Sequence, residues 1–211
     1  MPPVPQRTSP TVRQLLPLLA GVAIVGAVIL WQAVFSHPQA PPASAAAQPS
    51  AIGGDFSLID QTGRRVNQDL LKGRWSAVFF GYVSCPDICP ATLQTLAEAK
   101  ARLPKDFPDL QIVFISVDPQ RDQPKVLKAF LEQSGFPAGA IGLTGTPAEI
   151  AAAAKAYRVF YQKEGDGPAY QMAHSAAIYL MNPQGRFVAP LSYELGPVRL
   201  ATDLQTAVKG N

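Results

Sequence analysis

Cysteine and histidine are scarce in this chain, with two of each among 211 residues, and excess charge of either sign is absent. Two of its 18 Lys and Arg residues, Arg7 and Arg13, lie in the first fifty positions, which hold no acid. The remainder therefore carries 16 basic against 15 acidic side chains, which leaves no basic surface for nucleic acid. A hydrophobic fraction of 47% is sufficient for one sizeable core, so we expect a single globular domain with additional segments.

Charged residues are missing from residues 15–35, LLPLLAGVAIVGAVILWQAVF. Twenty-one such residues suffice to cross a hydrocarbon core of about 30 Å, which predicts a transmembrane anchor. Arg7 and Arg13 precede it and no Lys or Arg follows before Arg64, so the positive-inside rule predicts a cytoplasmic N-terminus and an exported remainder. A cleaved signal peptide, with a small-residue site at 43–45, is the alternative, but its apolar region usually spans only about 7 to 15 residues.

The predicted layout follows from this anchor. Residues 1–14 form a cytoplasmic N-terminus, and residues 36–50 form a linker rich in Pro and Ala that lacks large apolar side chains and so should be an extended tether. Residues 51–211 form the folded domain. His37 is most simply a linker residue. No long Arg- and Ser-rich transit segment precedes the anchor, which favours a bacterial inner membrane with the domain in the periplasm over a mitochondrion.

Apolar runs and helical patterns alternate through the domain. The turn at residues 61–63 lies in a predicted hairpin, and the turn at residues 183–185 lies in a second one. The expected strands are 75–82 and 110–118, which are of the buried type, together with 176–182 and 186–191. The expected helices are 90–103, 124–134, 147–157 and 197–208. This order predicts an α/β fold with a central mixed β-sheet and helices on both faces. Functional sites of such sheets gather at the carboxyl ends of strands.

Both cysteines lie in FFGYVSCPDICPATL, residues 79–93, where a buried strand should turn into a helix. Pro90 suits the first helical position, which makes Cys89 the expected cap residue and places Cys85 in the preceding loop. Both thiols then face the positive end of the helix dipole, which favours thiolate. Thiolate is the form that attacks disulfides and binds soft metals.

Three functions compete for this cysteine pair. A structural disulfide is allowed in an exported domain, but a loop closed by three residues stabilises little. A dithiol oxidoreductase usually has two intervening residues rather than three. Sulfurs in a disulfide are about 2.05 Å apart, whereas two sulfurs that each lie about 2.3 Å from one metal can stand further apart. The wider loop therefore favours a shared metal.

Two thiolates suit copper(I) or zinc, and either metal usually takes at least one more protein ligand. His174 is the only histidine in the predicted domain. Its loop would reach the cysteines if the strand 176–182 lies beside the strand 75–82. A capping or surface role is the alternative for His174. Met172 is a softer candidate, although a methionine in an apolar setting is more often core filler.

Asp118 ends the predicted strand 110–118 and so points toward the same edge of the sheet. A carboxylate there could orient a metal ligand or relay a proton. Asp118 before Pro119 is equally a common turn opener, and Asp122 could simply precede the next helix. Both interpretations remain open.

Four segments in this order resemble the Sco/SenC family of membrane-anchored copper proteins. They are GGDFSLIDQTGRRV (53–66), residues 79–93, ISVDPQRDQP (115–124) and AHSAAIYLMNPQGRF (173–187). The resemblance implies a thioredoxin-like fold that binds one copper ion through two cysteines and one histidine. These ligands fall on Cys85, Cys89 and His174.

The family acts in cytochrome c oxidase assembly and helps to metallate the binuclear copper site of subunit II, so that subunit and an upstream copper donor are the implied partners. Oxidation of Cys85 and Cys89 to a disulfide would remove the site, which predicts that redox state gates copper binding. We expect such a chain to be a metallochaperone rather than an enzyme, with thiol-disulfide oxidoreductase activity left open. The main alternative is a membrane-tethered thiol-disulfide reductase that keeps the partner's copper-ligand cysteines reduced. A peroxidase of related fold has no further feature in its favour.

Many members of this family have an acidic residue just before the ligand histidine, where this chain has Ala173. If that acid orients the imidazole, another group must do so here. Asp118 is the candidate that we expect.

Overall fold

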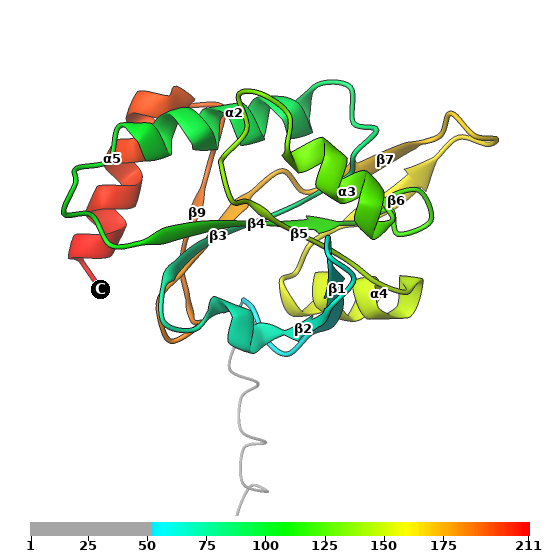
Figure 1. Ribbon diagram of the computed structural model, residues 1–211, viewed down its shortest axis with the longest axis horizontal. Coiled ribbons are helices and arrows are strands. Elements are labelled where there is room, and N and C mark those ends of the chain that lie inside the picture. The colour runs from blue at the N-terminus through cyan, green and yellow to red at the C-terminus, as the bar shows by residue number, and fades with distance from the viewer. Residues whose placement is uncertain (1–51) are drawn as a thin grey trace, which may run out of the picture. The chain divides into compact units, whose positions relative to one another are not determined.

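A seven-stranded sheet lies at the centre of the computed structural model, which describes residues 52–211 (Figure 1). In sheet order the strands are β2 (Arg65–Asn67), β1 (Ser57–Asp60), β5 (Ile141–Thr144), β4 (Leu110–Ser116), β3 (Trp75–Gly81), β8 (Ile178–Met181) and β9 (Phe187–Leu191). β3 pairs in parallel with β4, and β4 with β5, whereas the other neighbouring strands are antiparallel. The sheet is therefore mixed, as the sequence predicts.

Helices cover both faces of this sheet. They are the short 3-10 helix η2 (Gln68–Leu71) and the α-helices α2 (Ile88–Ala101), α3 (Pro124–Leu131), α4 (Pro147–Ala156) and α5 (Gly196–Lys209). Figure 1 shows α2 and α3 on one side of the sheet and α4 on the other. α2 packs against α5, α3 against β5 and α4 against β1. The predicted α/β architecture is confirmed for the described residues.

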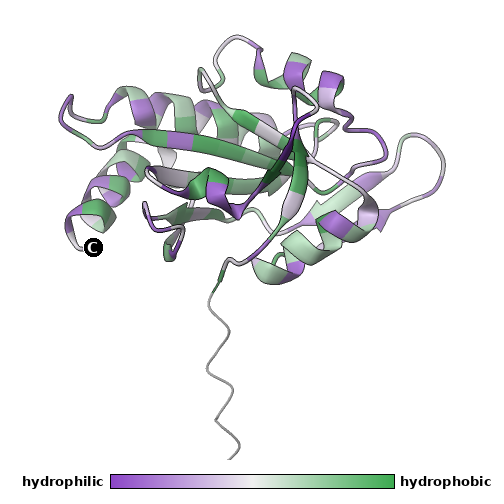
Figure 2. Ribbon diagram, turned by 60° about the horizontal axis from the view of Figure 1, so that its bottom comes forward, coloured by the Kyte–Doolittle hydropathy of each residue, from purple (hydrophilic) through white to green (hydrophobic). Residues whose placement is uncertain are grey.

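The two central strands are buried along their whole length. Every residue of β3, WSAVFFG, and of β4, LQIVFIS, is buried, and Figure 2 shows these strands as largely hydrophobic. A strand covered by helices on both faces needs apolar side chains on both faces, which explains continuous runs rather than alternation. The Phe79 and Phe114 rings, paired across the two strands, have centroids 5.9 Å apart. β3 thus provides a rigid base for the loop that follows it.

The prediction for the start of α2 is wrong by two residues. The helix begins at Ile88 with Asp87 as its N-cap, so Cys89 is the second helical residue and not the cap. Pro90 is the third. Proline is tolerated there because the first N–H groups of a helix have no partner within it. Cys89 therefore lies in the first turn of the helix.

Sequence patterns miss two features. β5 is a four-residue strand that contains a glycine, too short for a clear signal. The hairpin of β6 (Tyr161–Glu164) and β7 (Gln171–His174) forms a separate two-stranded sheet. β6 is YQKE and mostly exposed, so it lacks apolar periodicity, although the glycines at residues 165 and 167 are a turn signal. His174 accordingly ends a strand, where the sequence predicts a loop.

The predicted anchor at residues 15–35 and the linker at 36–50 lie outside the described residues. Between residues 52 and 211, no helix has the length and apolar character needed to span a bilayer.

Candidate metal centre

The two cysteines lie where β3 leads into α2. Cys85 is in the connecting loop, and its Sγ accepts a hydrogen bond of 3.4 Å from the N–H of Cys89 in the first turn of the helix. Both side chains are buried, with 8% of Cys85 and none of Cys89 exposed, and both are free thiols. The expected junction at the carboxyl end of a buried strand is confirmed.

His174 approaches the cysteines from a segment that is distant from them in the sequence. It is the last residue of β7, and the next strand, β8, pairs antiparallel to β3 with Phe79 opposite Ile178. Its Nε2 lies 3.6 Å from Sγ of Cys89. The ligand atoms of Cys85, Cys89 and His174 all lie within 4.8 Å of one another. The structure thus brings together the three candidate ligands that the sequence indicates.

The imidazole of His174 is held by the backbone carbonyl of the next residue and by two aromatic rings. Its Nδ1 lies 3.0 Å from the carbonyl oxygen of Ser175. Because a carbonyl only accepts hydrogen bonds, Nδ1 carries the proton and the Nε2 lone pair faces the sulfurs. Phe79 and Tyr82 contact the ring edge-on at centroid distances of 6.2 and 5.8 Å. This tautomer is the one that a metal on Nε2 requires.

The two thiols have opposite electrostatic environments. The hydrogen bond from the Cys89 thiol holds the pKa of Cys85 far below its ordinary value, and the N–H groups of Cys89 and Asp87 act in the same direction against burial. The same hydrogen bond, together with burial, raises the pKa of Cys89. In the metal-free state Cys85 is therefore a thiolate and Cys89 its proton donor.

A surface cleft of about 360 Å³ opens onto the site. Its lining includes Tyr82, Cys85, Ile88, Met172 and His174. Cys89 is not among the lining residues and is fully buried. Access from solvent therefore runs through Cys85 and His174, which makes them the groups that a partner molecule meets first.

Asp118 lies near this region but its described hydrogen bonds go elsewhere. The carboxylate, 3% exposed, accepts hydrogen bonds from Nε of Arg121 and, at 2.7 Å, from the Tyr170 hydroxyl. The partner of the His174 Nδ1 is the Ser175 carbonyl instead. A direct role of Asp118 on the imidazole therefore remains a prediction, with no contact in its favour.

Sequence reasoning also misses the contacts of Asp122 and the close packing at Gly81. The carboxylate of Asp122 is fully buried and accepts hydrogen bonds from the Val83 N–H at 3.0 Å and the Ser116 hydroxyl at 2.6 Å. Burial raises its pKa to about 6. At Gly81, a Cβ atom would meet Cys89 Sγ at 2.7 Å and the Phe114 ring at 2.9 Å. Glycine at this position allows the sulfur to pack against the end of β3.

Two thiols and one neutral imidazole offer a soft donor set, which suits copper(I) or zinc better than calcium or magnesium. Among the described residues, these three are the group of His, Cys, Asp or Glu side chains placed to hold a metal. The fold and the site together define a thiol-containing α/β protein with a candidate metal centre at the carboxyl edge of its sheet.

The SCO1/SenC family model matches residues 44–209. An "SCO2-like protein" of Rickettsia felis is 39% identical over 163 residues, which cover 76% of this chain and 77% of that protein. The chain belongs to the SCO1/SenC family, and its described part has the thioredoxin-like Sco fold.

Two solved structures illustrate the likeness. Arabidopsis thaliana ScoI with copper bound is 37% identical, with a TM-score of 0.72 over 76% of this chain and all of that one. BsSco, described as having a disulfide switch and as a member of the Sco family of cytochrome c oxidase assembly proteins, is 27% identical. Its TM-score is 0.59 over 76% of this chain and 95% of that one.

The contact at Gly81 generates a prediction. Gly81→Ala should displace the Cys89 sulfur, lower the affinity for the soft probe ion copper(I) by about tenfold, and destabilise the fold by about 1 to 3 kcal/mol through overpacking. Competition titration and urea denaturation measure the two effects.

Gly142→Ala, on β5, is the matched control for Gly81→Ala, because the added Cβ atom would meet Leu131 Cδ1 at 2.7 Å. It should destabilise similarly while copper(I) affinity stays unchanged. Equal affinity in both variants would contradict the packing role of Gly81.

Proposed function

We propose that this chain is a copper-binding assembly protein whose Cys85, Cys89 and His174 hold one copper ion. The observation that carries the proposal is the convergence of two sulfurs and one imidazole nitrogen within 4.8 Å. The donor chemistry fits copper(I), which favours thiolate and imidazole ligands. Copper is here a cargo, and three protein ligands leave it accessible to incoming ligands of a recipient.

The chain's own residues prepare this site. Ser175 fixes the imidazole tautomer through its carbonyl, and the first turn of α2 stabilises the Cys85 thiolate. Metal binding then requires loss of only the Cys89 proton. Because Cys85 and His174 line the cleft, exchange of ligands with a recipient would begin at these two residues.

We also propose that redox state gates copper binding. Joining the Cys85 thiolate and the Cys89 thiol in a disulfide removes two electrons and one proton, and a disulfide of a partner protein can accept them by thiol-disulfide exchange and leave as one thiol and one thiolate. A disulfide has no thiolate to offer, so the site is lost. The disulfide switch in the name of the BsSco structure supports this proposal.

The proposed recipient is the binuclear copper site of cytochrome c oxidase subunit II, with an upstream copper donor. Family membership and the description of BsSco as belonging to cytochrome c oxidase assembly proteins support this partner. We place the domain on the periplasmic side of a bacterial inner membrane, tethered by residues 15–35. The tether is supported by the uncharged, apolar sequence of that segment, which is long enough to cross a bilayer.

A second candidate function is reduction of the recipient's copper-ligand cysteines by a membrane-tethered thiol-disulfide reductase. The specific observation in its favour is the stabilised thiolate of Cys85 in the cleft above a fully buried Cys89. Cys85 would attack a partner disulfide and release one thiol. Cys89 would then attack the Cys85 sulfur, release the second thiol and leave an internal disulfide.

Copper titration distinguishes these two functions. The reduced full chain, in detergent and without oxygen, should bind one copper(I) equivalent against a competing chelator, and His174→Ala should lower the affinity by at least about tenfold, or about 1.4 kcal/mol. His37→Ala, which removes the linker histidine, is the control and should change nothing. Equal affinity in wild type and His174→Ala would exclude His174 as a ligand and favour the reductase.

The redox gate gives a separate prediction. Oxidation to the Cys85–Cys89 disulfide, verified by resistance to thiol alkylation, should abolish copper binding, and dithiol reduction should restore it fully. The reason is that neither sulfur of a disulfide is a thiolate, which is the form of cysteine that binds the metal. Copper analysis after gel filtration measures both states. Copper that stays on the alkylation-resistant form would disprove the gate.

A further inference from the structure

The two halves of the candidate metal centre lie on separate elements. Cys85 and Cys89 follow β3, whereas His174 ends the β6–β7 hairpin, whose two strands pair only with each other among the strands of residues 52–211. An isolated two-stranded ribbon is marginally stable in water. The position of the imidazole therefore depends on contacts that the hairpin makes with the rest of the domain.

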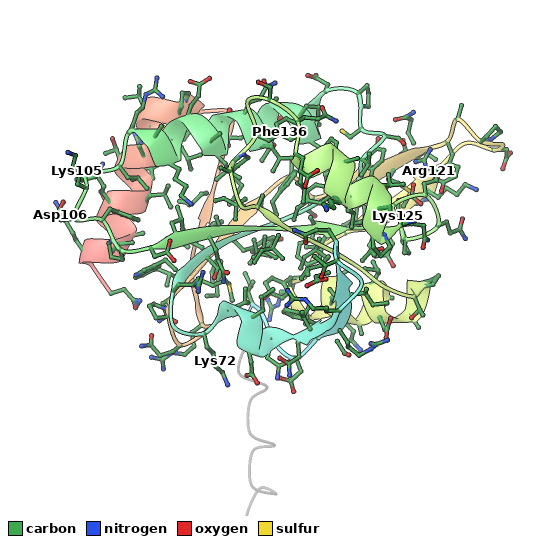
Figure 3. The ribbon with its side chains drawn as sticks, viewed as in Figure 1. Lys72, Lys105, Asp106, Arg121, Lys125 and Phe136 are labelled. Atoms are coloured by element: carbon green, nitrogen blue, oxygen red, sulfur yellow. The ribbon has the colours of Figure 1, made fainter. Side chains whose placement is uncertain are left out.

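Arg121, in the loop between β4 and α3, makes such contacts with the hairpin. Its Nη1 donates to the carbonyl oxygen of Tyr170 at 3.0 Å and to that of Pro168 at 3.4 Å. Its guanidinium carbon lies 3.7 Å from the centroid of the Tyr170 ring. Figure 3 shows Arg121 beside the hairpin. Tyr170 immediately precedes β7, so these contacts fix the beginning of the strand that ends at His174.

Asp118 holds this arginine in place. One carboxylate oxygen accepts from Nε of Arg121, and the other accepts from the Tyr170 hydroxyl at 2.7 Å. Asp118 is almost completely buried and the Arg121 side chain largely so. A buried ion pair with several hydrogen bonds fixes geometry more firmly than an exposed one. Asp118, Arg121 and Tyr170 together are called the Arg121 clamp below.

The loop between β4 and α3 also contacts the segment that carries the cysteines. Asp122 accepts a hydrogen bond from the N–H of Val83, two residues before Cys85. Tyr82, next to Val83, donates its hydroxyl to the Gln171 side chain in β7 at 2.8 Å. The β4–α3 loop therefore contacts both the segment that carries the thiols and the hairpin that carries the imidazole.

We propose that the Arg121 clamp is a set of positioning residues that holds β7 so that Nε2 of His174 faces the two sulfurs. This inference rests on the proposed function of the site. The clamp acts through strand β7 and does not contact the imidazole, whose Nδ1 donates a hydrogen bond to the Ser175 carbonyl. Groups that orient a metal ligand typically contribute about 10- to 100-fold in metal affinity.

A double-mutant cycle tests this role. The neutral pair Asp118→Asn with Arg121→Gln avoids a buried unpaired charge, and it is made in the full chain with His174 and with His174→Ala. The pair should lower copper(I) affinity by about tenfold when His174 is present, and by less than about twofold when it is absent, because the clamp acts only through this ligand. A similar loss in both backgrounds, or no loss in either, would overturn the proposal.

The matched control is a second Arg–Asp ion pair, Arg199 with Asp203, on α5. Arg199→Gln with Asp203→Asn removes the same charges from a helix that Figure 1 shows on the opposite side of the domain from the hairpin. Copper(I) affinity should stay unchanged. A tenfold loss in this control would mean that the clamp variant reports a general effect of charge removal.

A copper-free measurement separates the clamp from the ligand set. Tyr170→Phe removes one hydrogen bond but keeps the stacked ring, so it should fold. Amide hydrogen exchange of the reduced, metal-free chain should show faster exchange in β7 and unchanged exchange in β3. Unchanged β7 exchange in both this variant and the neutral pair would refute the clamp. If His174→Ala leaves copper affinity unaltered, the ligand set is wrong, whereas hydrogen exchange still decides whether the clamp holds β7.

Discussion

The antiparallel pairing of β8 with β3 is the contact on which the metal centre depends. β3 ends just before the thiols, and β8 begins a few residues after His174, so the pairing of Phe79 with Ile178 brings both ends to one edge of the sheet. The two ligand groups are more than eighty residues apart in sequence, and the rigid, buried strands between them fix their distance. The three candidate ligands come within reach of one another only at this edge.

Much of this arrangement could be predicted from the sequence. The buried runs at β3 and β4, the alternation with helices and the cysteine spacing indicate the sheet and its edge, and the lone histidine of the domain indicates the third ligand. The β6–β7 hairpin could not be predicted in this way, because β6 is polar and exposed and carries no periodic signal. Neither could the contacts of Asp118 and Arg121 with Tyr170, because these depend on tertiary packing between segments far apart in the chain. The helix start at Ile88 also departs from the proline rule, since Pro90 fits anywhere in a first turn that needs no N–H.

The chemistry of the site follows from the hydrogen bond between two thiols that differ in their access to the cleft. Cys85 lines the cleft and carries the negative charge, whereas Cys89 is enclosed against Gly81 and keeps the proton. This asymmetry favours copper binding, because only one proton must leave the two thiols. It also favours thiol-disulfide exchange, because the accessible Cys85 can attack a partner disulfide and the buried Cys89 can then attack the Cys85 sulfur. The same geometry therefore supports both copper delivery and thiol reduction. The imidazole of His174 distinguishes the two functions, because only copper binding uses it.

X-ray absorption spectroscopy of the full chain loaded with one equivalent of copper(I) tests the ligand set most directly. The account predicts two sulfur scatterers and one nitrogen scatterer at the copper, with the outer-shell signal of an imidazole ring that disappears in His174→Ala. A spectrum with sulfur ligands alone, identical in wild type and His174→Ala, would contradict the account.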